Sequence, residues 1–413
     1  NIKYIMKKSI LSIDSSYPYQ IMKERKLFSI VLGRNLNGYF SKIWNCNPVS
    51  TILEKKNSKN RYGKLNFFRY SSSILFIEAK MGRYEFLSYF EKINFFISQI
   101  SLLISLIKII KKYQIKLIRS ENPYYNGILA YILSKVCKIP FIVGVWGNPG
   151  KIRTYTQKPI MKNLFKKVWI EELVEKFILK KAKFVMVQNL DNKKFVLSRD
   201  ILGEKIKTFY VGNLIDKIHF TEPKHRKFED KNLILNKNSQ SILVISRLEK
   251  LKLVDHVLYA FSMIDKKIDC TLFFVGDGEY KNEMIETSKK LGILDKVVFC
   301  GNKNQKWIAN FIPQMSVVVS PLTGRALAEV SFGAAPVVAY DLDWHSEIIE
   351  HNKTGLLVKV YDYKSMSKSI EKMLLNKDEA KAMGLSLRKR AWQLLDPNLC
   401  DKQQKSIFDI IYN

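Results

Sequence analysis

Short apolar runs alternate along the chain with longer segments whose apolar residues recur at helical spacing. The runs are predicted strands, at Ser9–Ile13, Lys116–Arg119, Phe141–Trp146, Phe184–Gln188, Ser241–Ser246, Cys270–Val275, Val297–Gly301, Val317–Val319 and Pro336–Tyr340. The periodic segments are predicted helices, at Tyr125–Cys137, Gln157–Lys181, Val254–Ile264, Tyr280–Leu291, Tyr363–Leu375, Asp378–Leu394 and Leu399–Tyr412. Because such alternation is typical of parallel strands joined by crossover helices, the pattern predicts an α/β protein.

The alternation is interrupted by a polar, irregular stretch that follows Asn213 and includes Pro223, His225 and residues 231–240. Such a stretch is typical of a domain junction. The 413 residues also exceed what one hydrophobic core usually supports. We therefore expect an N-terminal domain at residues 1–215, a second domain at 216–395 and a C-terminal helix at 396–413.

Phe95–Ile110 is the most apolar segment of the chain. Gln99, three serines and Lys108 interrupt it, and we expect it to be too short to span a bilayer. One interpretation is a buried helix with its basic end near the negative pole of the helix dipole. The other is a helix at a membrane interface, because basic residues follow it at Lys108, Lys111, Lys112, Lys116 and Arg119.

The formal charge of +31, from 69 Lys and Arg against 38 Asp and Glu, makes nucleic acid or an anionic membrane a candidate partner. The basic residues are scattered and mostly lysine, and part of the excess fits general compositional drift. Zinc-finger spacing, an aromatic RNA-binding pattern and an arginine-rich tail are all missing from the sequence. We therefore expect no nucleic acid as a partner.

The five cysteines are widely separated and include no CxxC pair. This spacing predicts neither a disulfide framework nor a zinc site, and it favours a reducing compartment. The first residues lack the long apolar core of a secretory signal. We expect a cytoplasmic protein.

The stretch from Val317 to Glu350 holds the clearest candidate for a binding site. Its first strand leads through Thr323-Gly324-Arg325 into a helix that begins at Ala326. Free backbone N–H groups in that first turn, with glycine allowing close approach, form an anion-binding geometry. The next strand ends at Asp341, and a short helix carries Glu347. Open α/β sheets bind ligands at this edge.

A second glycine-containing turn, Gly276-Asp277-Gly278, follows the strand Cys270–Val275. It is compatible with close approach of a phosphate or a sugar to the backbone. Tight strand-to-helix turns also use glycine for purely structural reasons. The motif alone leaves both interpretations open.

Several motifs of the second half occur together in one order and spacing. They are Arg247-Leu248 with Lys252, Gly276-Asp277-Gly278, Glu329, Gly333, Pro336–Ala339, Asp341, Glu347 and Thr354–Val358. In this combination the second half resembles glycosyltransferase family 4. The first half resembles that family more loosely, through Gly127, Ile139–Phe141 and Asn213–Asp216.

The resemblance implies the GT-B architecture, in which two Rossmann-like domains face each other across a cleft and a C-terminal helix can cross back to the first domain. It implies transfer of a sugar from a nucleotide-diphosphate donor, with retention of configuration and without a bound metal. No tightly bound cofactor is expected, and UDP- and GDP-sugars are the first candidates for the co-substrate. The implied acceptor is a glycan or a lipid-linked molecule, as in bacterial surface polysaccharide synthesis.

The resemblance also implies roles for particular residues. Arg247 and Lys252 match the pair that binds the diphosphate, although solvated loop residues would look the same. The backbone N–H groups of Gly324, Arg325 and Ala326 would add to this positive site. Glu329 matches the carboxylate that holds the ribose hydroxyls, with a helix-surface glutamate without a role as the alternative.

The chain departs from the family pattern at Pro321, where relatives usually carry a first glutamate that contacts the transferred sugar. Arg325 either takes part of that space or faces solvent. Asp341, or Glu347 beside Trp344 and His345, could replace the missing contact. A lone loop histidine such as His345 is more often ordinary surface than a catalytic base.

On the acceptor side, Gly147-Asn148-Pro149 stands where many relatives carry a histidine. Asn148 can hydrogen-bond a sugar but cannot act as a base. Glu121 and Asn122 also follow a strand end, and they are either acceptor contacts or part of a plain surface loop.

A catalytically silent relative that only binds a nucleotide sugar or glycan stays an alternative. We expect the enzyme to be peripheral on the inner face of the cell membrane, attracted by anionic lipids.

Overall fold

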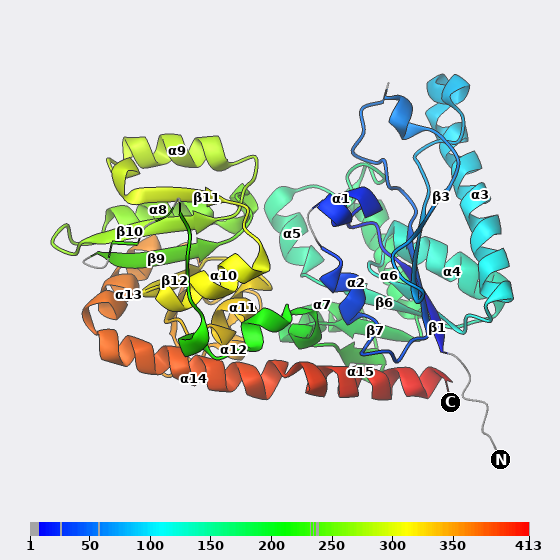
Figure 1. The fold of residues 1–413 in the computed structure, drawn as a ribbon. Coiled ribbons are helices and arrows are strands. Elements are labelled where there is room, and N and C mark those ends of the chain that lie inside the picture. The colour runs from blue at the N-terminus through cyan, green and yellow to red at the C-terminus, as the bar shows by residue number, and fades with distance from the viewer. Residues whose placement is uncertain are drawn as a thin grey trace, which may run out of the picture. The chain divides into compact units, whose positions relative to one another are not determined.

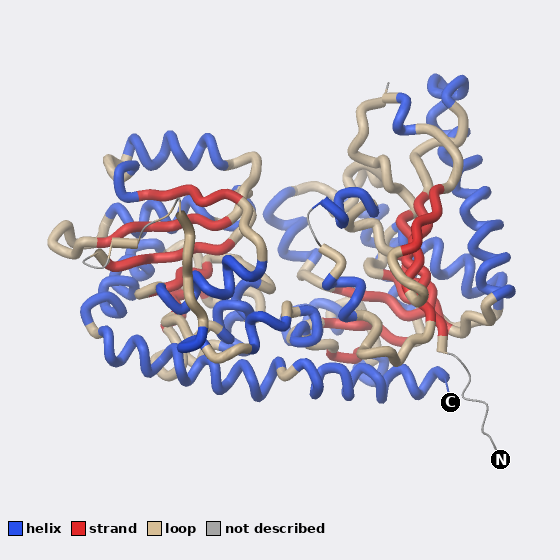
Figure 2. The backbone as a smooth tube through the Cα atoms, in the orientation of Figure 1, coloured by secondary structure: helices blue, strands red, loops and turns tan. Residues whose placement is uncertain are grey.

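The computed structural model describes residues 8–24, 27–56, 58–231, 233, 235–236 and 239–412. The chain divides into two compact domains, one formed by residues 1–214 with 398–413 and the other by residues 215–397. Each is built on one sheet with helices packed against it (Figures 1 and 2). The predicted α/β class with two Rossmann-like domains is confirmed.

The first sheet has the strand order β3-β4-β2-β1-β5-β6-β7-β8. All neighbouring strands pair in parallel except β3 and β4, which are antiparallel. The strands are β1 (Ser9–Ile13), β2 (Lys42–Asn47), β3 (Asn66–Arg69), β4 (Ile74–Glu78), β5 (Leu117–Ser120), β6 (Phe141–Val145), β7 (Phe184–Val187) and β8 (Ile206–Thr208). Strands β6 and β7 are buried at every residue, which is why their sequences are continuous apolar runs.

Two cores cover the two faces of this sheet. The helices α3 (Glu91–Lys112), α4 (Tyr125–Cys137) and α6 (Val168–Lys181) contribute to one core, through residues such as Leu106, Leu133 and Ile178. The other core contains Phe40 and Phe408. The remaining α-helices of residues 8–214 are α1 (Tyr19–Glu24), α2 (Ser29–Gly33), α5 (Pro149–Thr156) and α7 (Leu190–Leu197).

The last helix, α15 (Pro397–Tyr412), packs in the first domain. The Tyr412 hydroxyl donates a hydrogen bond of 2.6 Å to the carbonyl of Ser9. Asp409 accepts from the Tyr39 hydroxyl at 2.7 Å, and Phe408 is fully buried. Phe408 and Tyr412 of α15 are thus part of the same core as Ile10 of β1.

The second sheet is entirely parallel, with the order β11-β10-β9-β12-β13-β14. Its strands are β9 (Gln240–Ile245), β10 (Cys270–Val275), β11 (Val297–Gly301), β12 (Val317–Ser320), β13 (Val337–Tyr340) and β14 (Leu356–Val358). Its α-helices are α8 (Val254–Ser262), α9 (Lys281–Lys290), α10 (Gln305–Phe311), α11 (Ala326–Phe332), α12 (His345–Ile348), α13 (Tyr363–Leu375) and α14 (Lys377–Leu395).

Two predicted helices differ from the structure. The segment Gln157–Lys181 is helical only from Val168 onwards, because Pro159 lacks an N–H and the Glu171 carboxylate accepts from the backbone of Ile160 and Met161 instead. The segment around Phe95–Ile110 is longer than expected. The helical stretch Glu85–Lys112 is long and apolar enough to cross a membrane by length and composition.

Candidate functional site

The loop after β9 and the loop after β10 are locked together by their backbones. The Leu248 N–H donates to the carbonyl of Asp277 at 3.1 Å, and the Tyr280 N–H donates to the carbonyl of Leu248 at 3.0 Å. A Cβ atom on Gly276 would lie 1.9 Å from the Ser246 carbonyl oxygen, and one on Gly278 would lie 2.3 Å from that of Leu248.

Gly276 and Gly278 therefore have a packing role, as the structural interpretation of this tight strand-to-helix turn predicts. Protein backbone fills the space where their side chains would be, and this contact sets the course of the loop that carries Arg247. Asp277, between them, has an exposed side chain that accepts from the Gly278 N–H at 2.8 Å. Contact between this turn and a ligand stays a prediction.

Arg247 and Lys252 lie in the loop after β9, as the sequence predicts. The Arg247 side chain is 65% exposed, and Nη1 forms an ion pair of 2.6 Å with Glu249. Burial lowers the pKa of Lys252, and the positive charge of Arg247 lowers it further, while Glu249 and Asp343 act in the opposite direction. Two cations that disfavour each other's charge are stabilised when an anion binds between or beside them.

The loop after β12 differs in detail from the predicted anion site. Gly324 has a left-handed φ of +59°, and its Cβ position is open. The Ala326 N–H donates to the Thr323 carbonyl at 3.3 Å. It is therefore not free, unlike the prediction, which counted it with the N–H groups of Gly324 and Arg325 as available to an anion. The Thr323 hydroxyl is buried and has no hydrogen-bond partner among the described residues, which leaves a donor available to a ligand.

Glu329 is buried in α11, which excludes an ordinary helix-surface glutamate. Arg325 lies one turn earlier and approaches it, with Nε 3.6 Å from Oε1. Arg325 therefore faces the Glu329 carboxylate. The sequence predicted that it either takes the space of the missing glutamate or faces solvent, and neither prediction included this contact.

Sequence reasoning missed His219, which interacts electrostatically with Glu329. The ring is fully buried, and its Nε2 lies 2.6 Å from Oε1 of Gln305. Burial lowers the pKa of His219, and the charge of Glu329 acts against this shift. His219 comes from the 3-10 helix η5 (Lys217–Phe220), and no motif in that segment marked it.

The loop after β13 corrects the prediction for His345. This side chain is fully buried, and Nδ1 lies 2.8 Å from the carbonyl of Tyr340. Because a carbonyl only accepts, Nδ1 carries the proton and Nε2 is a hydrogen-bond acceptor. Nε2 has no partner among the described residues.

Burial lowers the pKa of His345 to about 4, with Asp341 acting against the shift and Lys252 adding to it. His345 is therefore a neutral acceptor close to the predicted phosphate-binding cations. Asp341 itself is exposed at the end of β13, and Glu347 is half-buried in α12. The sugar contacts predicted for these two carboxylates stay predictions.

At the carboxyl edge of the first sheet, Glu121 is buried in an ionic cluster. Its carboxylate accepts from Nε of Arg119 at 2.6 Å and from Nε1 of Trp146 at 2.7 Å. Arg34 lies 3.5 Å from the same carboxylate and 2.8 Å from Asp14. The plain surface-loop interpretation of Glu121 is therefore wrong. Asp14 and Arg34 were missed because they are far from Glu121 in sequence.

Asn148 and Asn122 both shape loops. Asn148 caps α5 by accepting from the Lys151 N–H at 3.2 Å, and its amide donates to Asp191 at 3.0 Å. The Asn122 side chain accepts from the Tyr124 N–H at 3.1 Å. Their direct contact with an acceptor stays a prediction.

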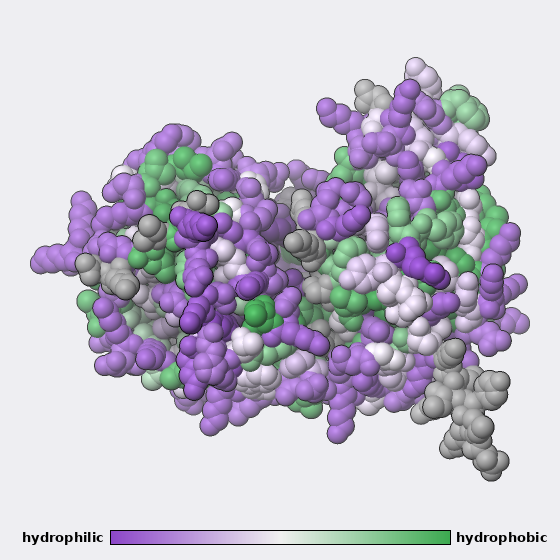
Figure 3. All heavy atoms as spheres, viewed as in Figure 1, coloured by the Kyte–Doolittle hydropathy of each residue, from purple (hydrophilic) through white to green (hydrophobic). Residues whose placement is uncertain are grey.

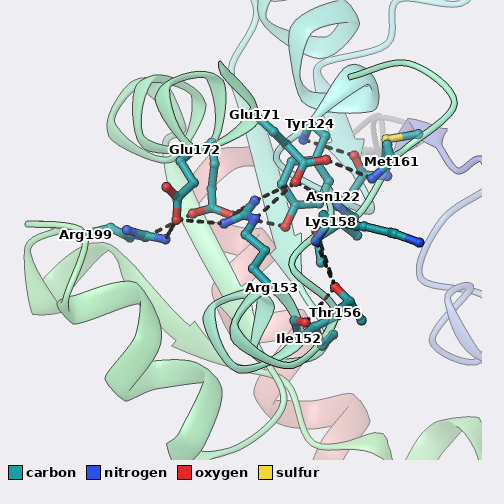
Figure 4. Close-up of polar contacts among 12 residues, drawn as sticks. Asn122, Tyr124, Ile152, Arg153, Thr156, Lys158, Met161, Glu171, Glu172 and Arg199 are labelled. Atoms are coloured by element: carbon teal, nitrogen blue, oxygen red, sulfur yellow. Dashed lines mark hydrogen bonds and ion pairs between the residues drawn. The ribbon is translucent and has the colours of Figure 1, made fainter. Parts of the chain in front are cut away.

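A buried network holds α5 in place (Figure 4). Nη2 of Arg153 lies 3.0 Å from Glu171 and 2.8 Å from Glu175, and both carboxylates are fully buried. Arg199 lies 3.0 Å from Glu175, and the Tyr124 hydroxyl donates to Glu175 at 3.1 Å. The network fixes the helix that Asn148 caps.

A pocket of ≈ 530 Å³ lies beside the ends of β1 and β2 in the first domain. Much of its lining comes from the loops that follow these two strands. Its polar lining includes Ser15, Ser16, Tyr17, Asn47 and Ser50. Its apolar lining includes Ile21, Val49 and Leu53, so the pocket combines hydroxyl and amide groups with apolar side chains. In the described ranges, no group of three or more His, Cys, Asp and Glu side chains could hold a metal ion.

Residues 225–390 match the family model of glycosyl transferases group 1. The chain is 25% identical over 173 residues to N-acetyl-alpha-D-glucosaminyl L-malate synthase of Bacillus anthracis, covering 41% of this chain and 45% of that protein. It is 25% identical over 178 residues to a GDP-mannose-dependent alpha-(1-6)-phosphatidylinositol monomannoside mannosyltransferase of Mycobacterium tuberculosis, covering 39% and 46%. The chain thus spans about half the length of these curated relatives.

The fold is similar to that of Anabaena HepE, solved in complex with UDP and glucose. The TM-score is 0.70 at 15% identity, over 97% of this chain and 99% of that one. At this identity the likeness concerns the fold. It supports the GT-B class for both domains.

Proposed function

We propose that the protein, whose residues 225–390 match the model of glycosyl transferases group 1, moves a sugar from a nucleotide-diphosphate donor to a glycan or lipid-linked acceptor with retention of configuration. The observation that carries the proposal is the placement of two cations, Arg247 and Lys252, at the carboxyl edge of the sheet within the matched residues. Glu329 lies in the same region, buried at the start of α11.

Cleavage of the bond between the anomeric carbon and the diphosphate puts negative charge on the leaving phosphate. Arg247 and Lys252 would stabilise that charge, and the Thr323 hydroxyl and the backbone at Gly324 could donate hydrogen bonds to the same group. In a front-face transfer the leaving phosphate accepts the proton of the acceptor hydroxyl. A protein base is then not required, which fits the absence of an acidic or basic side chain at Asn148.

The nucleotide of the donor is proposed to be UDP or GDP. The HepE structure holds UDP, and the name of the mycobacterial relative specifies GDP-mannose. Glu329 would accept hydrogen bonds from the ribose hydroxyls, and His219 beside it would keep the carboxylate in a buried, polar setting.

The acceptor is proposed to occupy the pocket lined by Ser15, Ser16, Tyr17, Asn47 and Ser50. Its lining combines hydroxyl and amide groups, which can bind a sugar, with apolar side chains. The mycobacterial relative acts, by its name, on a glycolipid, which supports a lipid-linked acceptor in surface glycan synthesis. Such an acceptor would place the enzyme at the cytoplasmic face of the cell membrane.

A thermal-shift screen against UDP-, GDP-, ADP- and CDP-sugars tests the proposal. A ligand that binds the folded protein at a hundred times its Kd adds about 2.7 kcal/mol of stability, which raises the melting temperature. One nucleotide should stand out, and its effect should be lost in Lys252→Ala. No shift with any of the four classes would contradict the proposal.

A second candidate, a silent relative that binds a donor without using it, is favoured by Pro321 in place of the usual glutamate. Hydrolysis of the donor, measured beside the binding titration, separates the two. Binding without any release of nucleotide, with and without glycolipid extracts as acceptor, would favour the silent protein.

A further inference from the structure

The side of α3 turned away from the first sheet carries a row of exposed apolar residues that continues into the 3-10 helix η2 (Glu85–Phe90). Their exposed fractions run from 50% for Ile104 to 95% for Tyr89. Within α3, spacings of three and four residues place Ile93, Phe96, Ile100 and Ile104 on one face, and Phe86, Tyr89 and Phe90 are exposed in the adjoining η2. This α3 apolar face consists of Phe86, Tyr89, Phe90, Ile93, Phe96, Ile100 and Ile104. Figure 3 shows hydrophobic side chains along the outer side of α3.

The charges beside the α3 apolar face are positive. Lys92 lies next to the face, and Lys108, Lys111 and Lys112 follow it in the last turns of the helix, all with exposed side chains. The sequence has no Asp or Glu between Lys92 and Lys112. Glu85 and Glu91 lie at the N-terminal end of the face, and Glu91 pairs with Lys56. An apolar face with an excess of lysines beside it is complementary to the interface of an anionic bilayer.

The opposite side of the same helix is anchored in the domain. Leu102, Leu106 and Ile110 belong to the core of the first sheet. Asn94 is fully buried and accepts from the N–H groups of Arg83 and Tyr84 at 2.6 and 2.9 Å. A helix held in this way cannot cross a bilayer without breaking these contacts. It can lie in the plane of the interface, with the α3 apolar face inserted.

Helix α3 also contacts the loop that lines the pocket beside the ends of β1 and β2. The Gln99 side chain donates to the carbonyl of Pro48 at 2.9 Å, and Lys56 pairs with Glu91 at 3.1 Å. The same loop supplies Val49, Ser50 and Lys55 to the pocket. Within the first domain, the pocket and the α3 apolar face are therefore joined by direct contacts.

We propose that the α3 apolar face is a membrane-docking surface that inserts into the interface of a bilayer containing anionic lipids and brings the adjoining pocket to the membrane surface. The role of that pocket in holding a lipid-linked acceptor rests on the function proposed above. Binding to the bilayer does not.

Vesicle flotation of the full chain tests the docking surface, with phosphatidylcholine alone or mixed with phosphatidylglycerol. The double variant Phe96→Ser, Ile100→Ser removes two exposed side chains, and we expect its partition coefficient to fall by about tenfold or more for each. The matched control is Leu375→Ser, Leu385→Ser, which removes two similarly exposed leucines from the second domain and should bind as the wild type does. Melting curves check that both variants are folded.

A triple variant, Lys108→Gln, Lys111→Gln, Lys112→Gln, separates the charge from the apolar contact. Its binding to anionic vesicles should be weaker than that of the wild type in about 0.1 M salt. The difference from the wild type should shrink in about 1 M salt, where the screening length drops from about 10 Å to about 3 Å.

Equal flotation of the wild type and the Phe96/Ile100 variant would overturn the proposal. So would a dimer in sedimentation velocity that this variant dissociates, because a second copy would then cover the face. No donor is present in these experiments, so their failure is distinct from failure of the transferase proposal.

Discussion

Lys252 and Arg247 are the two side chains on which the proposed chemistry depends most. Replacing either by alanine should lower turnover by about a hundredfold or more, the range for losing one preorganised group that stabilises developing charge. Folding should change little for Arg247→Ala because that side chain is mostly exposed. Steady-state kinetics with the donor identified by thermal shift measures the effect.

Lys250→Ala is the matched control, since Lys250 is an exposed lysine in the same turn as Lys252. It should leave turnover near that of the wild type. If all three variants retain wild-type rates, the assignment of Arg247 and Lys252 to the diphosphate is wrong.

Burial of His345 predicts a pH dependence of the free energy of unfolding. Its folded pKa of about 4 lies below the unfolded value of 6.5, so in this window the unfolded chain binds a proton that the folded chain does not. The contribution of neutral His345 to the free energy of unfolding is therefore complete above pH 6.5. It is lost as the pH falls toward 4, and the total loss is about 3 kcal/mol.

Urea unfolding at several pH values, for the wild type and His345→Asn, measures this contribution. Asparagine can still donate to the Tyr340 carbonyl but does not titrate. The difference in unfolding free energy between the two proteins should change across the window by the stated amount. Parallel pH profiles would show that the imidazole is not kept neutral by its burial.

At the scale of single elements, α5 depends on one buried side chain. Arg153→Met would leave the buried Glu171 without its nearest cation and Glu175 with Arg199 alone, and the expected cost is about 3–5 kcal/mol. Lys158→Met, in the exposed turn after α5, is the control and should cost little. Chemical denaturation gives the free energies.

The Arg153 variant should also change hydrogen exchange locally. Amides of α5 and of residues 157–167 should lose protection first, because the network holds these segments to α6. Uniform loss of protection over the whole first domain would show instead that the network supports the domain as a unit.

At the scale of the whole molecule, the C-terminal helix contributes its stability to the first domain. Phe408 is fully buried in α15 against Phe40 and Phe209, and Phe408→Ala should cost about 3–5 kcal/mol. Ile410→Ala, on the exposed side of the same helix, is the control. Limited proteolysis during thermal unfolding, with mass spectrometry of the fragments, assigns the loss to a domain.

In that experiment, cleavage should appear earlier within residues 8–214 while the second domain keeps its stabilisation by nucleotide. Loss of nucleotide stabilisation in Phe408→Ala would mean that the two domains unfold together. The helix would then stabilise the whole chain.

The sequence alone determined the elements whose residues are buried on every side and the motifs whose chemistry is local. Short apolar, β-branched runs favour strands of a covered sheet, and β1, β10 and β11 were predicted to the residue, although the edge strand β11 is mostly half-buried. The roles of Arg247, Lys252 and Glu329 were inferred from the resemblance to a glycosyltransferase family, and they stay predictions. Strands β2 to β4 were missed, because polar residues such as Asn45 and Asn47 interrupt β2 and are buried only through tertiary contacts.

Tertiary structure alone decided what each polar or glycine residue contacts. The sequence places His345 in a loop, and only the fold shows that it is buried. The sequence left open whether Gly276 and Gly278 serve a ligand or the packing of the turn, and only the neighbouring loop shows their packing role. Glu121 has a local partner in Arg119, but the fold alone brings the distant Arg34 to within 3.5 Å of its carboxylate. The physical reason is the same in each case: burial and pairing depend on neighbours that are remote in sequence, whereas periodicity and local motifs do not.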